Sequence, residues 1–136
     1  MRFGKKSIVT LAMIGALSVG TTALGNQEDR RAAMKAIGAA SKAISEGTDV
    51  AANAAIIAEK AGMIPELFAT EEITGDSTAL PIIWEKSDDF NAIGAKLVDA
   101  ANIVADVAGG GGDVAAAGKA MGAVCGECHG DYRVKR

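Results

Sequence analysis

Five consecutive residues, Cys125-Gly126-Glu127-Cys128-His129, contain both cysteines and the single histidine of the chain. Their spacing is C-x-x-C-H, the attachment signature of a c-type haem. On a helix, side chains three and four residues apart share one face, so the two thiols and the imidazole would emerge together. Both thiols can then form thioethers with the porphyrin vinyl groups. The pattern predicts one covalent haem c, with His129 as the proximal iron ligand.

Two other kinds of site use cysteines at similar spacing. Cys-Gly-x-Cys resembles a thiol–disulfide redox site, but that site needs a strand before its first cysteine, and residues 114–124 are rich in alanine and glycine. A structural zinc site has four protein ligands, and this stretch supplies three. The sequence favours haem, with a haem-free thiol oxidoreductase as the rival that uses Cys125 and Cys128.

The second axial position of the iron decides what it can do, and no second histidine is available for it. Three methionines follow residue 26. Met121 lies one helical turn before Cys125 and is interpreted as a core residue, whereas Met63 lies where a helix ends before Pro65. Met34 is the predicted distal ligand. The alternative is that Met34 only packs beside an open iron site.

The neighbours of Met34 favour a flat, anionic cofactor. Arg30 precedes Met34 by one turn and Gly38 follows it by one turn, on one helix face. A glycine lets a flat ring approach the backbone closely. Arg30 or Arg31 could pair with a haem propionate through a fork of N–H donors.

The first 25 residues predict a secretory signal peptide. Arg2, Lys5 and Lys6 precede an apolar run over residues 7–19, and Ala23-Leu24-Gly25 suits cleavage after Gly25. The mature domain would then be residues 26–136. Cleavage removes three of the 14 basic residues and none of the 17 acidic ones, so the net charge falls from −3 to −6. We therefore expect an exported, periplasmic and soluble protein that does not bind nucleic acid.

Apolar residues recur at helical spacing in four segments of the mature part. The segments and their apolar stripes are residues 28–46 (Met34, Ile37, Ser41, Ile44), residues 49–62 (Val50, Ala54, Ile57, Ala61), residues 87–108 (Phe90, Ile93, Leu97, Ala101, Val104) and residues 113–132 (Val114, Ala117, Met121, Cys125, Cys128, Tyr132). Residues 63–86 are predicted as a long connection, and residues 109–112 as a four-glycine hinge. The fold class is therefore all-α, an antiparallel four-helix bundle.

Two features of these segments bear on the cofactor. The stripes contain many small residues, which leave space that a planar group can fill, so we expect the protein without haem to be poorly folded. The long connection carries the only tryptophan, Trp84. Trp84 is predicted either to cover the end of the bundle or to pack on the haem edge.

The C-x-x-C-H stretch followed by Asp131-Tyr132-Arg133, together with Arg30-x-x-x-Met34, resembles the class II c-type cytochromes, the family of cytochrome c′. Ile64-Pro65-x-Leu67-Phe68 and Pro81-x-Ile83-Trp84 extend the resemblance over the mature chain. The resemblance implies a four-helix bundle with haem near the C-terminus. The family has high-spin members with an open distal site and low-spin members with a methionine ligand. Residues 34–40 are more similar to the low-spin branch.

These expectations combine into a functional prediction. The main prediction is an electron carrier that cycles iron between Fe(III) and Fe(II) with His/Met ligation. Its predicted partners are periplasmic redox proteins. The alternative is a high-spin protein whose open distal site binds NO or CO. No enzymatic activity is expected, because no catalytic base or nucleophile set is present and the only histidine is assigned to iron. The family resemblance implies a monomer or a homodimer formed through the first two helices.

Overall fold

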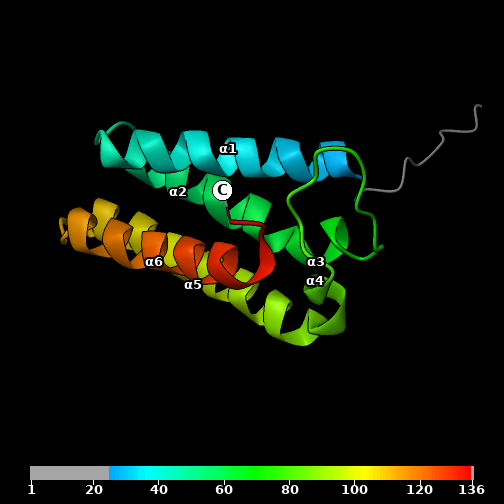
Figure 1. The fold of residues 1–136 in the computed structure, drawn as a ribbon. Coiled ribbons are helices and arrows are strands. Elements are labelled where there is room, and N and C mark those ends of the chain that lie inside the picture. Colours follow the sequence, from blue (N-terminus) through cyan, green and yellow to red (C-terminus); the bar gives the residue numbers. More distant parts are fainter. Residues whose placement is uncertain (1–24, 136) are drawn as a thin grey trace, which may run out of the picture.

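The computed structural model describes residues 25–135, in which four long helices form the bundle and two short helices lie in the connection between its halves. Figure 1 shows the long helices running alongside one another, and each is antiparallel to the next in sequence. The elements are α1 (Gln27–Ser45), α2 (Val50–Gly62), α3 (Ile64–Leu67), α4 (Ile82–Glu85), α5 (Ser87–Gly110) and α6 (Val114–Tyr132). The predicted all-α bundle is confirmed. The proposed signal peptide lies outside the described residues except for Gly25.

Local signals explain where the long helices begin and end. The Asn26 side chain accepts a hydrogen bond of 2.9 Å from the Asp29 N–H and so caps α1. Gly47, at φ +72°, ends α1 in the left-handed region that glycine adopts readily. The Asp113 carboxylate accepts from the Ala116 N–H at 2.9 Å and so caps α6. Asp49 directly precedes α2 but makes no side-chain cap bond to it.

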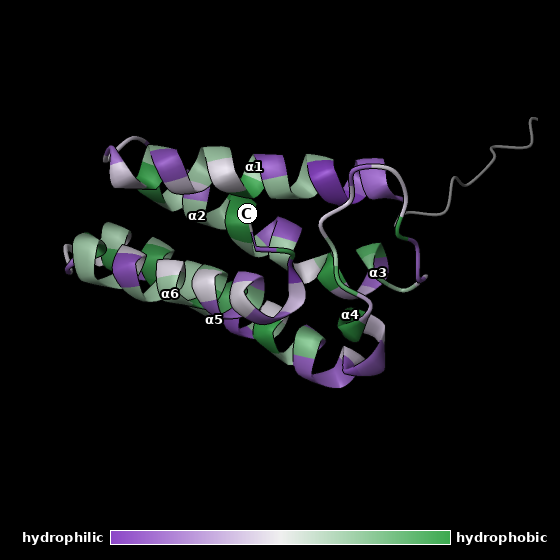
Figure 2. Cartoon of the chain, in the orientation of Figure 1, coloured by the Kyte–Doolittle hydropathy of each residue, from purple (hydrophilic) through white to green (hydrophobic). Residues whose placement is uncertain are grey.

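The core of the bundle lies where α2 packs on α5. All five residues of the predicted α5 stripe are buried, as are three of the four on α2. Gly94 allows α3 to come close, because a Cβ built there would lie 3.4 Å from the Ile64 side chain. Figure 2 shows hydrophobic residues on α2 and polar ones along the outward side of α1. The close packing therefore comes from aliphatic side chains on the two middle helices.

Each of the two outer helices, α1 and α6, packs closely against only one other long helix. α1 packs on α2, and α6 packs on α5, but α1 and α6 scarcely touch each other. Within α6 only Met121 and Tyr132 are buried, although six positions were expected to form its inner stripe. The bundle is therefore closed through its middle pair and open between its first and last long helices.

Residues 68–81, called here the crossover loop, run from α3 back beside the start of α1 and then to α4 (Figure 1). The loop also pairs with the chain after α6: the Leu80 N–H donates to the Tyr132 carbonyl at 3.0 Å, and the Val134 N–H donates to the Thr78 carbonyl at 2.8 Å. An isolated bridge joins Ala79 to Arg133. The loop thus joins both outer helices at one end of the bundle.

Two sequence expectations need correction. The connection over residues 63–86 was predicted without regular structure, yet α3 and α4 lie within it, because Ile64, Leu67 and Ile83 gain burial there. The four glycines over residues 109–112 do not all form a hinge. Helix α5 continues through Gly110, and the turn comes at Gly111, whose φ is +73°.

None of the helices described is long and apolar enough to cross a membrane.

Candidate haem site

A cavity of about 700 Å³ occupies the space between α1 and α6. Its walls come from the face of α1 between Gln27 and Ser41, the last two turns of α6, and residues 76–79 of the crossover loop. Single side chains of α4 and α5 close it toward the core. The volume falls in the range of pockets that hold small molecules and cofactors. The open side of the bundle is therefore a binding site for a sizeable group.

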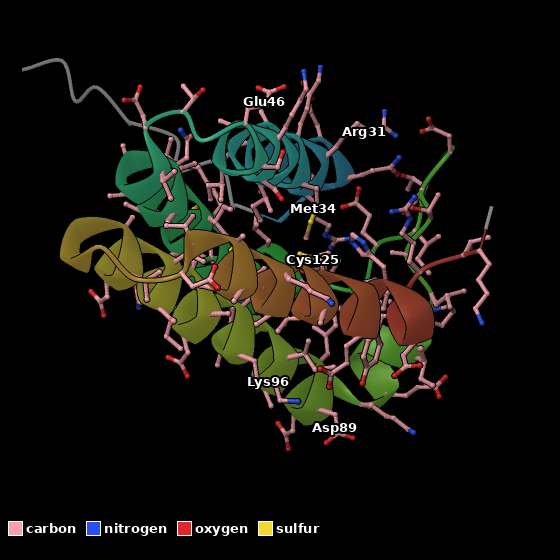
Figure 3. All side chains as sticks on the ribbon, turned by 90° about the vertical axis from the view of Figure 1, so that its left-hand side faces the viewer. Arg31, Met34, Glu46, Asp89, Lys96 and Cys125 are labelled. Atoms are coloured by element: carbon pink, nitrogen blue, oxygen red, sulfur yellow. The ribbon has the colours of Figure 1, made fainter. Side chains whose placement is uncertain are left out.

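All three motif residues line this cavity. Cys125 and Cys128 are half-buried and not joined in a disulfide, and His129 is exposed beside them. Since α6 is continuous from Val114 to Tyr132, the helical spacing places the three side chains on one face, as predicted. In Figure 3 the sulfur of Cys125 points from α6 into the space between the outer helices. Two thiols and an imidazole are thus presented to one volume.

Burial shifts the pKa of both thiols and of the imidazole away from their ordinary values. Burial, followed by the negative groups nearby, raises the pKa of the Cys128 thiol to about 11. Burial also raises the pKa of Cys125. A reactive redox cysteine needs a lowered pKa because the thiolate is the nucleophile, so these values disfavour thiol–disulfide exchange. Burial and the charge of Arg133 lower the pKa of His129, which favours the neutral imidazole that can bind a metal.

Met34 lies on the opposite wall of the cavity. Its side chain points from α1 toward Cys125 on α6 (Figure 3), and it is partly buried. Gly38, one turn later, also lines the cavity, and a Cβ built there would meet no atom within 4 Å. Met63 lies at the junction of α2 and α3, away from this cavity. Met121 is 2% exposed, which confirms it as a core residue. Met34 is therefore the methionine placed across from the motif.

Aromatic and aliphatic side chains form the apolar floor of the site. Phe68, Phe90 and Tyr132 line the cavity and pack edge to face, with ring centroids 4.9 Å apart for the first pair and 5.2 Å for the second. The periodic pattern had placed Phe90 and Tyr132 on inner stripes. Phe68 and residues 76–79 were missed as cavity residues, because a loop has no periodicity that reveals which side it turns inward.

Trp84 is not among the residues that line this cavity, and its predicted packing on the haem edge stays a prediction. Its indole N–H donates to the Phe68 carbonyl at 2.8 Å, and its ring lies 6.4 Å from the Phe68 ring. The indole N–H needs a partner when it is buried, and the carbonyl after α3 supplies one. This bond joins Trp84 of α4 to the chain that follows α3.

The two arginines predicted to contact a propionate have different surroundings. Arg31 is exposed, lines the cavity, and donates to the Asp76 carboxylate at 2.6 Å. Arg30 is buried, and its guanidinium donates to three backbone carbonyls, those of Leu67, Thr70 and Glu72, each at 2.7 Å. These carbonyls belong to the last residue of α3 and to the crossover loop, where they would otherwise lack protein partners. A propionate contact for either arginine stays a prediction.

Taken together, the residues present fit a covalently bound haem. The cavity offers two free thiols and an imidazole on one helix, a thioether across from them, and an apolar floor. Cys125 and Cys128 would hold the porphyrin, and the imidazole of His129 on α6 and the thioether of Met34 on α1 would be available to its iron. Arg133 at the cavity wall carries positive charge that suits the acidic groups of the cofactor.

Comparison with known proteins agrees with this chemistry. The family model described as Cytochrome C′ matches residues 25–133. The chain belongs to the cytochrome c′ family. It is therefore a class II c-type cytochrome, and the cofactor of this family is covalent haem c.

Relatives of this chain include cytochromes c-556 and c-554 and a cytochrome c′. A cytochrome c-556 of Agrobacterium fabrum is 41% identical, over 96% of this chain and 97% of that protein. A cytochrome c-554 of Cereibacter sphaeroides is 42% identical over 64% of this chain and 67% of that protein. Among solved structures, a cytochrome c′ from Rhodopseudomonas palustris superposes with a TM-score of 0.65 at 31% identity, covering 80% of this chain and 95% of that one. The four-helix bundle is thus shared with a known cytochrome of this family.

Proposed function

We propose that this class II cytochrome is a periplasmic electron carrier with His129 and Met34 as the axial ligands of one haem c. The observation that carries the proposal is the placement of Met34 on α1 across the cavity from the motif on α6 (Figure 3). The relatives named cytochrome c-556 and c-554 support it as well.

Each residue of the site has a role that its environment supports. Cys125 and Cys128 fix the cofactor to α6, and the neutral imidazole of His129 is available as a ligand on the same side. Haem c supplies a one-electron Fe(III)/Fe(II) couple when it is bound. A thioether ligand such as Met34 favours Fe(II) and raises the reduction potential. Phe68, Phe90 and Tyr132 keep water from the inner side of the cavity.

The wider setting follows from the sequence. Export through the signal peptide would bring the thiols to the compartment where c-type haem is attached. The mature net charge of −6 favours encounters with positively charged faces of periplasmic redox proteins. The site would act as a carrier and not as an enzyme, since its only imidazole is used as a ligand.

Mass and visible spectra of the exported protein test the proposal. We expect the mature chain to weigh one haem more than its amino acids. We also expect low-spin spectra in both oxidation states, with a sulfur-to-iron charge-transfer band in the ferric form. A chain without the added mass would remove haem altogether. High-spin spectra would assign the open distal site that binds NO or CO.

A pair of methionine variants tests the distal ligand. Met34→Ala is expected to give a high-spin protein that binds carbon monoxide readily. Met63→Ala is the matched control, because Met63 lies away from the cavity, and its spectrum should stay that of the parent. An unchanged spectrum in Met34→Ala would take Met34 off the iron.

A further inference from the structure

Arg30 is the only charged residue in residues 25–135 that is buried, at 5% exposed. None of the ion pairs in this part of the chain includes Arg30, so no carboxylate there lies within 4 Å of its guanidinium. A buried charge is costly unless it is paired or well hydrogen-bonded. The structure must therefore stabilise this cation by other means.

Backbone carbonyls and aromatic faces provide that stabilisation. Three carbonyls accept from Nε, Nη1 and Nη2, all at 2.7 Å. The guanidinium carbon lies 4.7 Å from the Phe68 ring centroid and 5.4 Å from that of Trp84, within cation–π range. These dipoles and rings hold the cation without neutralising it. An arginine remains protonated even where burial lowers its pKa, so a full positive charge stays in the wall of the cavity.

The adjacent Arg31 is in a contrasting environment. Its side chain is 57% exposed, and it pairs with the Asp76 carboxylate, which is 74% exposed. Water and this counter-charge screen its field, whereas the field of Arg30 acts through a low-dielectric interior. Two neighbouring arginines of equal charge therefore differ in how strongly they act on a group in the cavity.

We propose that Arg30 is a positioning residue that raises the reduction potential of the iron through its buried charge and holds the crossover loop over the cavity. The inference rests on the proposed function. Fe(III) carries one more positive charge than Fe(II), so a fixed cation nearby disfavours the ferric form. The same guanidinium orders residues 67–72, which places Phe68 against the site.

Three variants of the holoprotein separate the charge from the packing. Arg30→Gln removes the buried charge and most of the hydrogen bonds that the guanidinium donates to the three carbonyls. Arg31→Gln removes an exposed charge of the same sign. Trp84→Phe removes the N–H that donates to Phe68 and weakens the loop, but it leaves the Arg30 charge in place. Each is compared with the parent by redox titration and by limited proteolysis of the crossover loop.

The titration has a definite expected outcome. At a fixed electrode potential, Arg30→Gln should lower the Fe(II)/Fe(III) ratio at least about threefold, where a tenfold change corresponds to 59 mV for one electron. Arg31→Gln and Trp84→Phe should each change it by less than about 1.5-fold, since neither removes an unscreened charge. In proteolysis, Arg30→Gln and Trp84→Phe should both be cleaved faster than the parent. The proposal would be overturned if the Fe(II)/Fe(III) ratio of Arg30→Gln equalled that of Arg31→Gln. It would also be overturned if Trp84→Phe lowered this ratio as much as Arg30→Gln does.

A second pair of variants covers the case in which Arg30→Gln does not fold. The Glu72 carboxylate is near enough to raise the pKa of Arg30, so it offsets part of the cation's field, while its backbone carbonyl holds the guanidinium. Glu72→Gln keeps that carbonyl and should raise the Fe(II)/Fe(III) ratio. Glu71→Gln, at the exposed neighbouring position, is the control and should raise it less. Equal effects of the two would contradict the inference. A chain that carries no covalent haem would instead contradict the proposed function.

Discussion

The two sides of this bundle are built from similar helices but are packed differently. On the α2–α5 side, Ile57 and Val104 are almost completely buried, and α3 approaches α5 over Gly94. On the α1–α6 side, the facing surfaces enclose a cavity of about 700 Å³. Apolar burial on the α2–α5 side therefore holds the protein together, and the α1–α6 side leaves room for the cofactor. Stability and function are thus divided between pairs of helices.

The largest effect should follow from preventing haem attachment. The double variant Cys125→Ser/Cys128→Ser leaves the open side without its covalent cofactor, and a void of this size has no compensating contacts. We expect unfolding at temperatures well below those of the holoprotein. Hydrogen exchange should be fast across α1 and α6 and slower across α2 and α5. Equal protection of all four helices would show that the two sides do not differ as described.

The next effect should come from the closed side. Ile57→Ala removes a side chain that is 1% exposed and should cost about 2–5 kcal/mol of unfolding free energy. Ile56→Ala is the matched control on the same helix, since Ile56 is 39% exposed, and it should cost less than about 1 kcal/mol. Chemical denaturation of the holoprotein measures both. Similar losses in the two variants would contradict the assignment of the core to this face of α2.

The cap of α6 should contribute a smaller amount. Asp113→Ala removes the hydrogen bond to the Ala116 N–H and should cost about 1 kcal/mol. Asp113→Asn retains a side-chain acceptor and should cost little, which makes it the control. Thermal unfolding of both variants measures the difference, and a loss in the Asn variant as large as that in the Ala variant would remove the cap from the explanation.

The smallest effect should come from the exposed ion pair between the last two helices. Lys96 on α5 donates to the Glu127 carboxylate of α6 at 2.9 Å, with both side chains largely in solvent. Water screens such pairs, so Lys96→Gln should change the unfolding free energy by less than about 1 kcal/mol. Denaturation at low and high salt measures it. A larger, salt-independent loss would mean that α6 is held by charge more than by its contacts with α5.

Most of the fold could be predicted from local patterns. The positions of Phe90, Ile93, Leu97, Ala101 and Val104 predicted α5 and its buried face, because a single periodic stripe dominates that segment. The prediction was less accurate for α6, where four of the six expected stripe positions are not buried. Two of those four positions, Cys125 and Cys128, line the cavity, and a periodic pattern does not distinguish a face that meets a helix from a face that meets a cofactor.

The site divides in the same way. The motif predicted its own side of the cavity, since Cys125, Cys128 and His129 are close in sequence and one helix places them. The surroundings of Arg30 and Trp84 were not predicted. Arg30 binds carbonyls 37 to 42 residues away, and Trp84 binds a carbonyl 16 residues away. Nothing local to either residue specifies those partners.

The sequence by itself determined the haem chemistry, the helical segments and the candidate ligand Met34, because each depends on residue types at short spacing. Only the tertiary structure decided that α1 and α6 stay apart, that the crossover loop joins them at one end, and that Arg30 is a buried cation while Arg31 is a screened one. These features depend on how distant segments share space and on which backbone carbonyls need a donor, and short spacing carries no information about either.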